Sequence, residues 1–332
     1  MEIGKNPSPT SDQDVSRLSP LPAWIRGPIR TLLRAWSHFP KAHGYLYYLV
    51  ENLGSRLAVG PLEGRLSNGA RMRCDLCEHM QRQIYFLGAY QPIETFLFPL
   101  LVKPGMVVVD AGAHIGQYTL LASPLVGASG AVHAFEPVPR NFEQLAYHIR
   151  ENGFATTVRM NKVALWHRAE TLHLYLKTEH ATNPGAYSAG PSLELVDSVT
   201  TRAVRLDDYV KENDIRRVDL IKMDIEGAEL FALQGAQELI TRWRPTMLVE
   251  LNRPACRGLG YEPEQIWEFL KPCGYEMWYL GASPQACHTL SSPPPEDIAN
   301  VVFHTEPLSD NITMGWSLKS AMTTNARRGG SW

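Results

Sequence analysis

Short apolar runs alternate along this chain with segments whose apolar residues recur every three or four positions. The runs predict strands over residues 107–110, 131–135, 158–165, 218–224, 246–251, 275–280 and 301–304. The segments between and before them predict helices over residues 81–101, 118–125, 139–152, 226–240 and 263–270. This alternation is typical of an α/β fold, so we expect a doubly wound, mostly parallel sheet of seven strands. Its ligand should bind at the carboxyl ends of the strands.

The pattern is lost at both ends of the chain. Residues 1–20 are rich in Ser, Pro and Asp and have no apolar period, so we expect a disordered tail there and a second loose tail over residues 309–332. Between the tails, residues 21–82 form an expected accessory segment and residues 83–308 the α/β domain.

The accessory segment is expected to hold helices, the second of them over residues 45–57, and a hairpin. A helix from Pro28 would carry Arg30 and Arg34 on one face and the following apolar residues on another: Ile29, Leu32, Leu33, Trp36 and Phe39. We favour that residues 28–39 pack on the α/β domain or form a lid over it; the alternative is that they contact a membrane surface. Asn68-Gly69 predicts the turn of a hairpin within residues 58–80.

A long polar segment separates two further predicted strands. Residues 171–176 and 200–206 have strand-like patterns, and residues 177–198 between them include Asn183-Pro184-Gly185. The segment is too long for a simple connection, so we expect a lid over the ligand.

The candidate ligand-binding site is centred on the turn after the first predicted strand. Val107 to Val109 lead into Asp110, and glycines follow at 112 and 116. Glycine permits positive φ and lets the backbone approach a ligand. A dinucleotide site needs three glycines spaced G-x-G-x-x-G, whereas this spacing is D-x-G-x-x-x-G and Asp110 would repel a phosphate. S-adenosylmethionine, which carries an amino group and a sulfonium but no phosphate, fits better.

The second predicted strand also ends in an acid. Glu136 follows Phe135, where a carboxylate can accept hydrogen bonds from both ribose hydroxyls of a nucleoside.

Four motifs in this order resemble those of the FkbM family of S-adenosylmethionine-dependent methyltransferases. They are Asp110-Ala-Gly112-Ala-His114-Ile-Gly116, Phe135-Glu136-Pro137, Val204-Arg-Leu-Asp-Asp-Tyr209 and Ile221-Lys-Met-Asp-Ile-Glu-Gly-Ala-Glu229. The resemblance covers approximately residues 83 to 252 and implies a Rossmann-like class I methyltransferase fold. The family usually has Asn where this chain has His114, so the hydrogen bonding of the turn can differ.

The resemblance also implies the cofactor site. Residues 161–164 lie where methyltransferases of this type pass their backbone along the adenine ring. The expected cofactor-binding residues are Asp110, Gly112, His114, Gly116, Glu136, Pro137, Ala164 and Asp224.

The composition of the chain limits the kinds of partner and the location that we expect for it. The chain of 332 residues has a net charge of −2, so no overall field attracts nucleic acid. No apolar run reaches the ~18 residues of a membrane-spanning helix. Five cysteines and no signal-peptide pattern favour a cytoplasmic location. The oligomeric state is not predicted.

Acids that end neighbouring strands are the catalytic candidates. The fourth predicted strand should lie between the first and the fifth, which places Asp224 beside the cofactor and near Glu250. Methyl transfer to a hydroxyl requires removal of a proton, and Asp224 is the expected base. Lys222 shares its face and is either a counterion, which we favour, or catalytic, while Glu226 adjusts the charge of Asp224.

Two alternatives concern the base. His180 in the long loop could reach the acceptor instead. Asp224, Glu250 and Asn252 also form a set of oxygen donors suited to Mg²⁺, which is possible here, but acids are common at such positions and we assign no metal residues.

These features favour methyl transfer from S-adenosylmethionine to a hydroxyl of a small molecule, lipid or sugar. The alternatives are a non-catalytic module that binds the same cofactor, or a methyltransferase acting on nitrogen or on a macromolecule. The chain lacks an Asn-Pro-Pro-Tyr motif and a basic stripe, which disfavours nucleic acid as substrate. The missing third glycine disfavours a nicotinamide oxidoreductase.

Overall fold

The computed structural model describes residues 23–37, 49–51, 61–177, 187–189, 195–280 and 287–308. The two expected tails, His180, most of the expected helix over residues 45–57 and most of the expected lid lie outside these residues.

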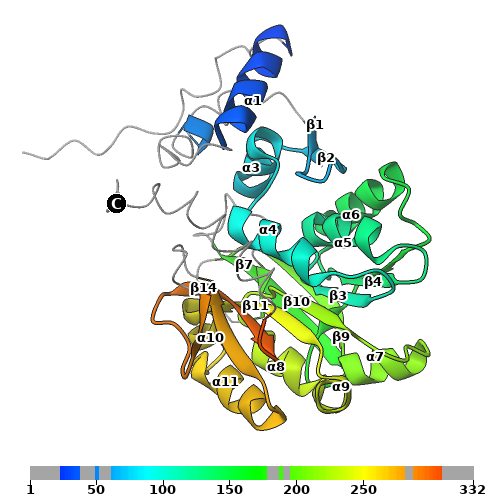
Figure 1. Cartoon of the computed structure of the whole chain (residues 1–332), viewed down its shortest axis with the longest axis vertical. Coiled ribbons are helices and arrows are strands. Elements are labelled where there is room, and N and C mark those ends of the chain that lie inside the picture. The colour runs from blue at the N-terminus through cyan, green and yellow to red at the C-terminus, as the bar shows by residue number, and fades with distance from the viewer. Residues whose placement is uncertain are drawn as a thin grey trace, which may run out of the picture.

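The main sheet has eight strands in the order β13-β12-β14-β11-β10-β3-β4-β5 (Figure 1). Their bounds are β3 Val107–Ala111, β4 Ala131–Phe135, β5 Val158–Asn161, β10 Leu220–Met223, β11 Thr246–Asn252, β12 Glu276–Leu280, β13 Cys287–Leu290 and β14 Ile298–His304. Strands β11, β10, β3, β4 and β5 pair in parallel, and β14 runs antiparallel between β11 and β12. The α/β class and the place of β10 between β3 and β11 are confirmed.

The expected number of seven strands was one too low. The extra strand, β13, pairs antiparallel with β12 at the edge of the sheet. Its sequence, Cys-His-Thr-Leu, is too short and too polar to stand out as an apolar run, so only its pairing reveals it.

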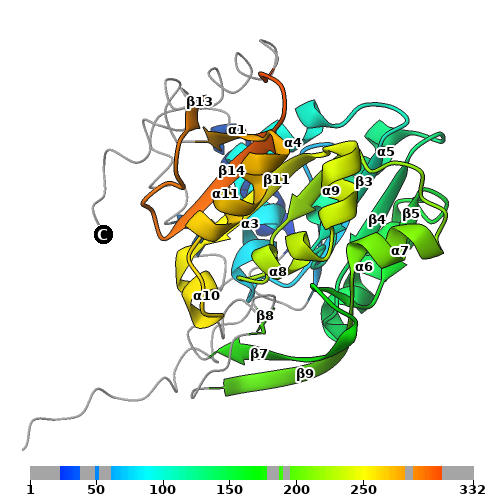
Figure 2. The same ribbon diagram turned by 90° about the horizontal axis from the view of Figure 1, so that it is seen from below.

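Helices cover both faces of the sheet (Figures 1 and 2). Their bounds are α1 Ala23–Ser37, α3 His79–Leu87, α4 Pro92–Leu101, α5 Gln117–Val126, α6 Pro139–Glu151, α7 Leu206–Glu212, α8 Glu229–Gln234, α9 Gln237–Trp243, α10 Arg253–Gly258 and α11 Glu264–Leu270. Successive side chains of β3 point to opposite faces of the sheet and so enter two different hydrophobic cores. Val108 packs with helices α3 to α6, and Val109 packs with α7 to α11. This explains why the central strands are apolar without interruption.

Two predicted helices are each divided. Residues 81–101 were expected to form one helix, but α3 ends at Gly88, and Gly88 and Gln91 have φ values of 83° and 48°. Residues 226–240 were also expected to form one helix. Glu226 and Gly227 instead have φ values of 53° and 93°, so α8 begins only at Glu229.

A second sheet of four strands has the order β6-β9-β7-β8. Its strands are β6 Ala164–Leu165, β7 Glu170–Lys177, β8 Tyr187–Ser188 and β9 Leu195–Val204, and Figure 2 shows β7 and β9 running side by side away from the main sheet. The predicted strand over residues 158–165 is therefore two strands, β5 and β6, in different sheets. We call the β7, β8 and β9 strands the arm.

The predicted hairpin is present as β1 Leu62–Arg65 and β2 Arg71–Cys74, with Gly69 at φ 87°. The expected faces of α1 were wrong in part: Ile29 and Leu33 pack in the core as expected, but Arg34 faces the hairpin and Leu32 faces outward. The Arg34 guanidinium donates to the carbonyl of Arg65 over 2.6 Å, while the Leu32 side chain is 69% exposed and Leu33 is buried. A long guanidinium can satisfy backbone carbonyls on the packed side of a helix, and an apolar period does not reveal this. None of the described helices is long and apolar enough to cross a membrane.

A buried histidine joins the hairpin to the glycine turn. His148 of α6 is fully buried, its Nδ1 lies 2.7 Å from the carbonyl oxygen of Ile115, and its Nε2 accepts from the amide of Arg73 over 2.8 Å. These partners require a neutral ring with the proton on Nδ1. Burial lowers the pKa of His148, which agrees with that form.

We expect His148→Ala to lower the free energy of unfolding by about 1–3 kcal/mol, because it leaves buried polar backbone groups without their partner. Urea unfolding measures this. His173→Ala, on the exposed side of β7, is the control and should change stability by less than about 0.5 kcal/mol.

The contribution of His148 should also depend on pH. Because the folded-state pKa is lowered, the unfolded chain binds the proton first, so the stability is present above the ordinary histidine pKa of about 6.5 and is lost as the pH falls below it. The difference between wild type and His148→Ala should therefore shrink below about pH 6.5. An unchanged difference down to pH 5 would contradict the neutral role.

Candidate active site at the carboxyl ends of the strands

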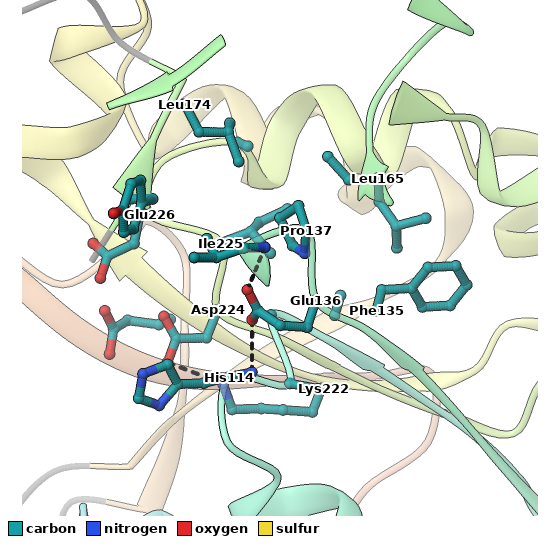
Figure 3. Close-up of a pocket in the computed structure, with 18 of the residues that line it drawn as sticks. His114, Phe135, Glu136, Pro137, Leu165, Leu174, Lys222, Asp224, Ile225 and Glu226 are labelled. Atoms are coloured by element: carbon teal, nitrogen blue, oxygen red, sulfur yellow. Dashed lines mark hydrogen bonds and ion pairs between the residues drawn. The ribbon is translucent and has the colours of Figure 1, made fainter. Parts of the chain in front are cut away.

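A cavity of about 1140 Å³, counted to its open mouth, lies at the carboxyl ends of β3, β4 and β10 (Figure 3). Its wall includes the glycine turn, the ends of β10 and β11, the loop before α4, and the arm. The expected site residues that line it are Gly112, His114, Glu136, Pro137, Ala164, Lys222, Asp224 and Glu226.

Gly112 is required by the approach of two turns. It has φ 79°, and a Cβ atom there would lie 1.9 Å from the carbonyl oxygen of Asp224. The amides of Gly112 and Ala113 both donate to the carbonyl of Phe135, over 3.0 and 2.9 Å. The turn after β3 therefore lies directly against the turn after β10.

Glu136 is buried and accepts two backbone amides. Its Oε2 accepts from His114 over 2.8 Å and its Oε1 from Val138 over 2.8 Å (Figure 3). Burial raises the pKa of Glu136 to about 7, and the two amides oppose the rise. A carboxylate has about four acceptor positions, so the carboxylate of Glu136 retains capacity for hydroxyl donors at the cavity wall.

Asp110 and Gly116 lie beneath this wall rather than in it. Asp110 is 1% exposed and accepts from the Thr119 hydroxyl over 2.5 Å, which ties β3 to the first turn of α5. At Gly116, φ is 101° and a Cβ would lie 2.7 Å from a methyl of Leu145, so glycine lets α5 and α6 approach.

One end of the cavity is apolar. Phe135, Pro137, Val163, Ala164 and Leu165 line it, and Figure 3 shows Phe135 and Leu165 on the side of Glu136 away from Asp224. Such a slot suits a flat, weakly polar ring beside a carboxylate that faces a sugar.

The other end holds buried charge. Lys222 is 1% exposed, and its Nζ lies 3.3 Å from Asp224 Oδ2 and 4.7 Å from the centre of the Tyr118 ring. Burial raises the pKa of Glu226 and of Glu250 above the ordinary range, and the negative charge of Asp224 adds to both shifts. Protons on Glu226 and Glu250 therefore reduce the negative charge that Lys222 alone does not neutralise.

Glu229, which sequence reasoning left without a role, shapes the turn after β10. Its Oε1 accepts from the amides of Ile225 and Gly227 over 3.0 and 3.3 Å. Burial raises the pKa of Glu229 to about 7, and these amides oppose the rise. This explains how Glu226 is held at a positive φ, which is uncommon for a non-glycine residue.

Sequence reasoning also missed Gln91. Its Nε2 donates to Glu250 over 2.8 Å and its Oε1 accepts from the Tyr118 hydroxyl over 3.1 Å. No motif marks Gln91, because only the fold brings the loop before α4 to the end of β11.

Of the two histidines expected near the site, His114 lies in the cavity wall. His114 has φ 51°, and its Nδ1 lies 3.0 Å from the sulfur of Met80. Burial lowers the pKa of His114 to about 4, so its ring is neutral near pH 7. His180 lies outside the described residues.

The expected oxygen donors for Mg²⁺ have other partners. Asn252 Oδ1 accepts from the amide of Ala255 at the start of α10, and its Nδ2 donates to Glu226 over 3.2 Å. Within the described ranges, no cluster of three His, Cys, Asp or Glu residues is arranged to hold a metal.

The order of the strands and the cavity at their carboxyl ends are those of a Rossmann-like methyltransferase. A family model described as the methyltransferase FkbM domain matches residues 110–277, half of the chain. The chain therefore belongs to the methyltransferase FkbM family.

Individual relatives are distant. Methyltransferase sdnD of Sordaria araneosa is 26% identical over 196 residues, which are 51% of this chain and 73% of that protein. The 31-O-demethyl-FK506 methyltransferase FkbM of Streptomyces tacrolimicus is 27% identical over 163 residues, which are 41% of this chain and 62% of that protein. A crystal structure of methyltransferase FkbM from Methylobacillus flagellatus KT has a TM-score of 0.43 and 16% identity, over 84% of this chain and 59% of that one. The matches thus span less than two thirds of the second and third of these proteins.

We expect Gly112→Ala to destabilise the fold more than Gly153→Ala. Both glycines have positive φ, so both substitutions carry a backbone strain of about 1–2 kcal/mol. At Gly153 a Cβ would have open space, whereas at Gly112 it must displace the backbone of Asp224, which adds about 1–3 kcal/mol. Equal losses in urea unfolding would contradict the close contact of the two turns.

Proposed function

We propose that this protein binds S-adenosylmethionine and transfers its methyl group to a hydroxyl of a small-molecule, lipid or sugar acceptor. The observation that carries the proposal is that Glu136 and Asp224 line one and the same cavity. Glu136 lies beside an apolar slot and Asp224 lies in the buried, charged end.

The residues around the cavity suit this cofactor. We propose that Glu136 accepts the ribose hydroxyls, and that Pro137 and Ala164 contact the adenine. Gly112 and His114 would let the backbone approach the methionine part, while Asp110 and Gly116 support the turn from beneath. When bound, the cofactor supplies an electrophilic methyl group.

The chain itself must position the acceptor and remove its proton. Asp224 has a quarter of its side chain exposed, whereas Lys222 beside it is buried. We propose that Asp224 holds the acceptor hydroxyl and accepts its proton, that Lys222 is the counterion of Asp224, and that Glu226 adjusts the charge of the pair. His180 remains the alternative base.

Other functions require other observations. A nitrogen or macromolecular acceptor would use the same cofactor site, and a non-catalytic module would retain Glu136 without needing Asp224. Transfer of tritium from labelled cofactor to an acceptor separates catalysis from simple binding.

Glu136→Ala should weaken S-adenosylmethionine binding by about 1.5–3 kcal/mol, the range for hydrogen bonds to a charged group. Isothermal titration calorimetry measures this affinity. Glu151→Ala, an exposed acid at the end of α6, is the control and should bind normally. Unchanged affinity in Glu136→Ala would refute the assignment of the ribose contact.

Asp224→Asn keeps the shape of the side chain and removes its charge. We expect cofactor affinity to change by less than about 1 kcal/mol while turnover falls by roughly 10²-fold or more, the scale of losing a general base. Calorimetry and a labelled-methyl assay measure the two quantities.

A second measurement separates a base from a metal ligand. EDTA should leave wild-type turnover unchanged if Asp224 acts as a base. Loss that Mg²⁺ restores would instead support the metal alternative with Glu250 and Asn252. Normal turnover in Asp224→Asn would rule out both roles.

A further inference from the structure

The arm forms part of the cavity wall beside the charged end. Leu172 and Leu174 of β7 line the cavity together with Tyr187 of β8 and Ala189 after it. Figure 3 shows Leu174 on the same side of the cavity as Glu226, away from Phe135 and Leu165 at the apolar slot. The side chains that face the acceptor end from the arm are thus predominantly apolar.

The arm is attached to the turn after β10. The Ser188 hydroxyl donates to the carbonyl of Glu226 over 2.9 Å. The Tyr187 hydroxyl donates to Asp197 Oδ2 over 2.5 Å, within the arm, so the cavity meets the Tyr187 ring while its hydroxyl is already bonded. The apolar wall is therefore held against the turn after β10.

Several polar groups at this end are bonded to one another. Gln91 uses its amide nitrogen on Glu250 and its amide oxygen on Tyr118, and Asn252 donates to Glu226. A site that recognises several hydroxyls of a sugar must offer placed donors and acceptors to each of them, since buried polar groups without partners are costly. Among the described wall residues, Asp224 is the group best placed to meet an acceptor hydroxyl.

We infer that the acceptor is an apolar molecule that presents its hydroxyl to Asp224, such as a lipid or other hydrocarbon alcohol, rather than a sugar. This inference rests on the proposed function and narrows its acceptor. The hydrocarbon part lies against Leu172, Leu174 and the Tyr187 ring, where burial of apolar surface supplies the affinity.

The experiment uses the full chain saturated with S-adenosylhomocysteine, which leaves the acceptor end open. The probes are 1-octanol and methyl β-glucoside, two neutral molecules that both carry hydroxyls. Saturation-transfer NMR titrations measure their binding. We expect 1-octanol to bind at least tenfold more tightly than methyl β-glucoside.

Variants of one strand provide the matched test. Leu174→Asn and Leu172→Asn place a polar group in the wall, and each should weaken 1-octanol binding at least fivefold. Thr171→Asn, on the exposed face of the same strand, should leave it unchanged. Because Leu174 is the more buried of the two leucines, Leu172→Asn keeps the test valid if Leu174→Asn fails to fold.

The outcomes distinguish failure of the proposed function from failure of the apolar-acceptor inference alone. Failure of the wild type to bind S-adenosylmethionine in calorimetry would overturn the proposed function and this inference with it. Normal cofactor binding with equal or tighter binding of methyl β-glucoside would overturn the apolar acceptor alone. Unchanged 1-octanol binding in folded Leu172→Asn and Leu174→Asn would also overturn it.

Discussion

The site depends on the way in which buried acids share a single lysine at the end of β10. Lys222 is almost completely buried and its described ion pair is with Asp224, while burial and then the negative charge of Asp224 raise the pKa of Glu226 and of Glu250. A buried lysine without a partner is costly, and so is a group of ionised acids, but the combination is tolerated when some acids retain protons. The result is a partly exposed Asp224 beside a buried lysine and two acids whose pKa is raised.

This arrangement requires two tight turns to be in contact. The turn after β3 contacts the backbone of Asp224 at Gly112, and Glu229 fixes the turn after β10 by accepting the amides of Ile225 and Gly227. The positive φ of Glu226 is the cost of placing its carboxyl beside Asp224. Strain, close packing and buried charge therefore occur at the same point of the fold, as is common for functional sites.

Elements outside the main sheet complete the cavity. The arm contacts the turn after β10 through Ser188, the loop before α4 contacts Glu250 through Gln91, and His148 connects the β1–β2 hairpin to the glycine turn. Each contact is a hydrogen bond between segments distant in sequence. The sheet positions the end of the cavity proposed to bind the cofactor, whereas these added segments form much of the end proposed to bind the acceptor.

The sequence alone determined the α/β class, the central strands and the sequence positions of Gly112, Glu136 and Asp224. These follow from local causes: buried strands need continuous apolar residues, tight turns need glycine, and parallel strands place their carboxyl ends at one edge. Only the tertiary structure decided that Asp110 lies beneath the cavity, that Arg34 faces the hairpin, that β13 joins the sheet, and that Gln91 and Glu229 serve the site. A side chain's role in these cases depends on a partner far away in the chain, and neither hydrophobic period nor local motif contains the identity of that partner.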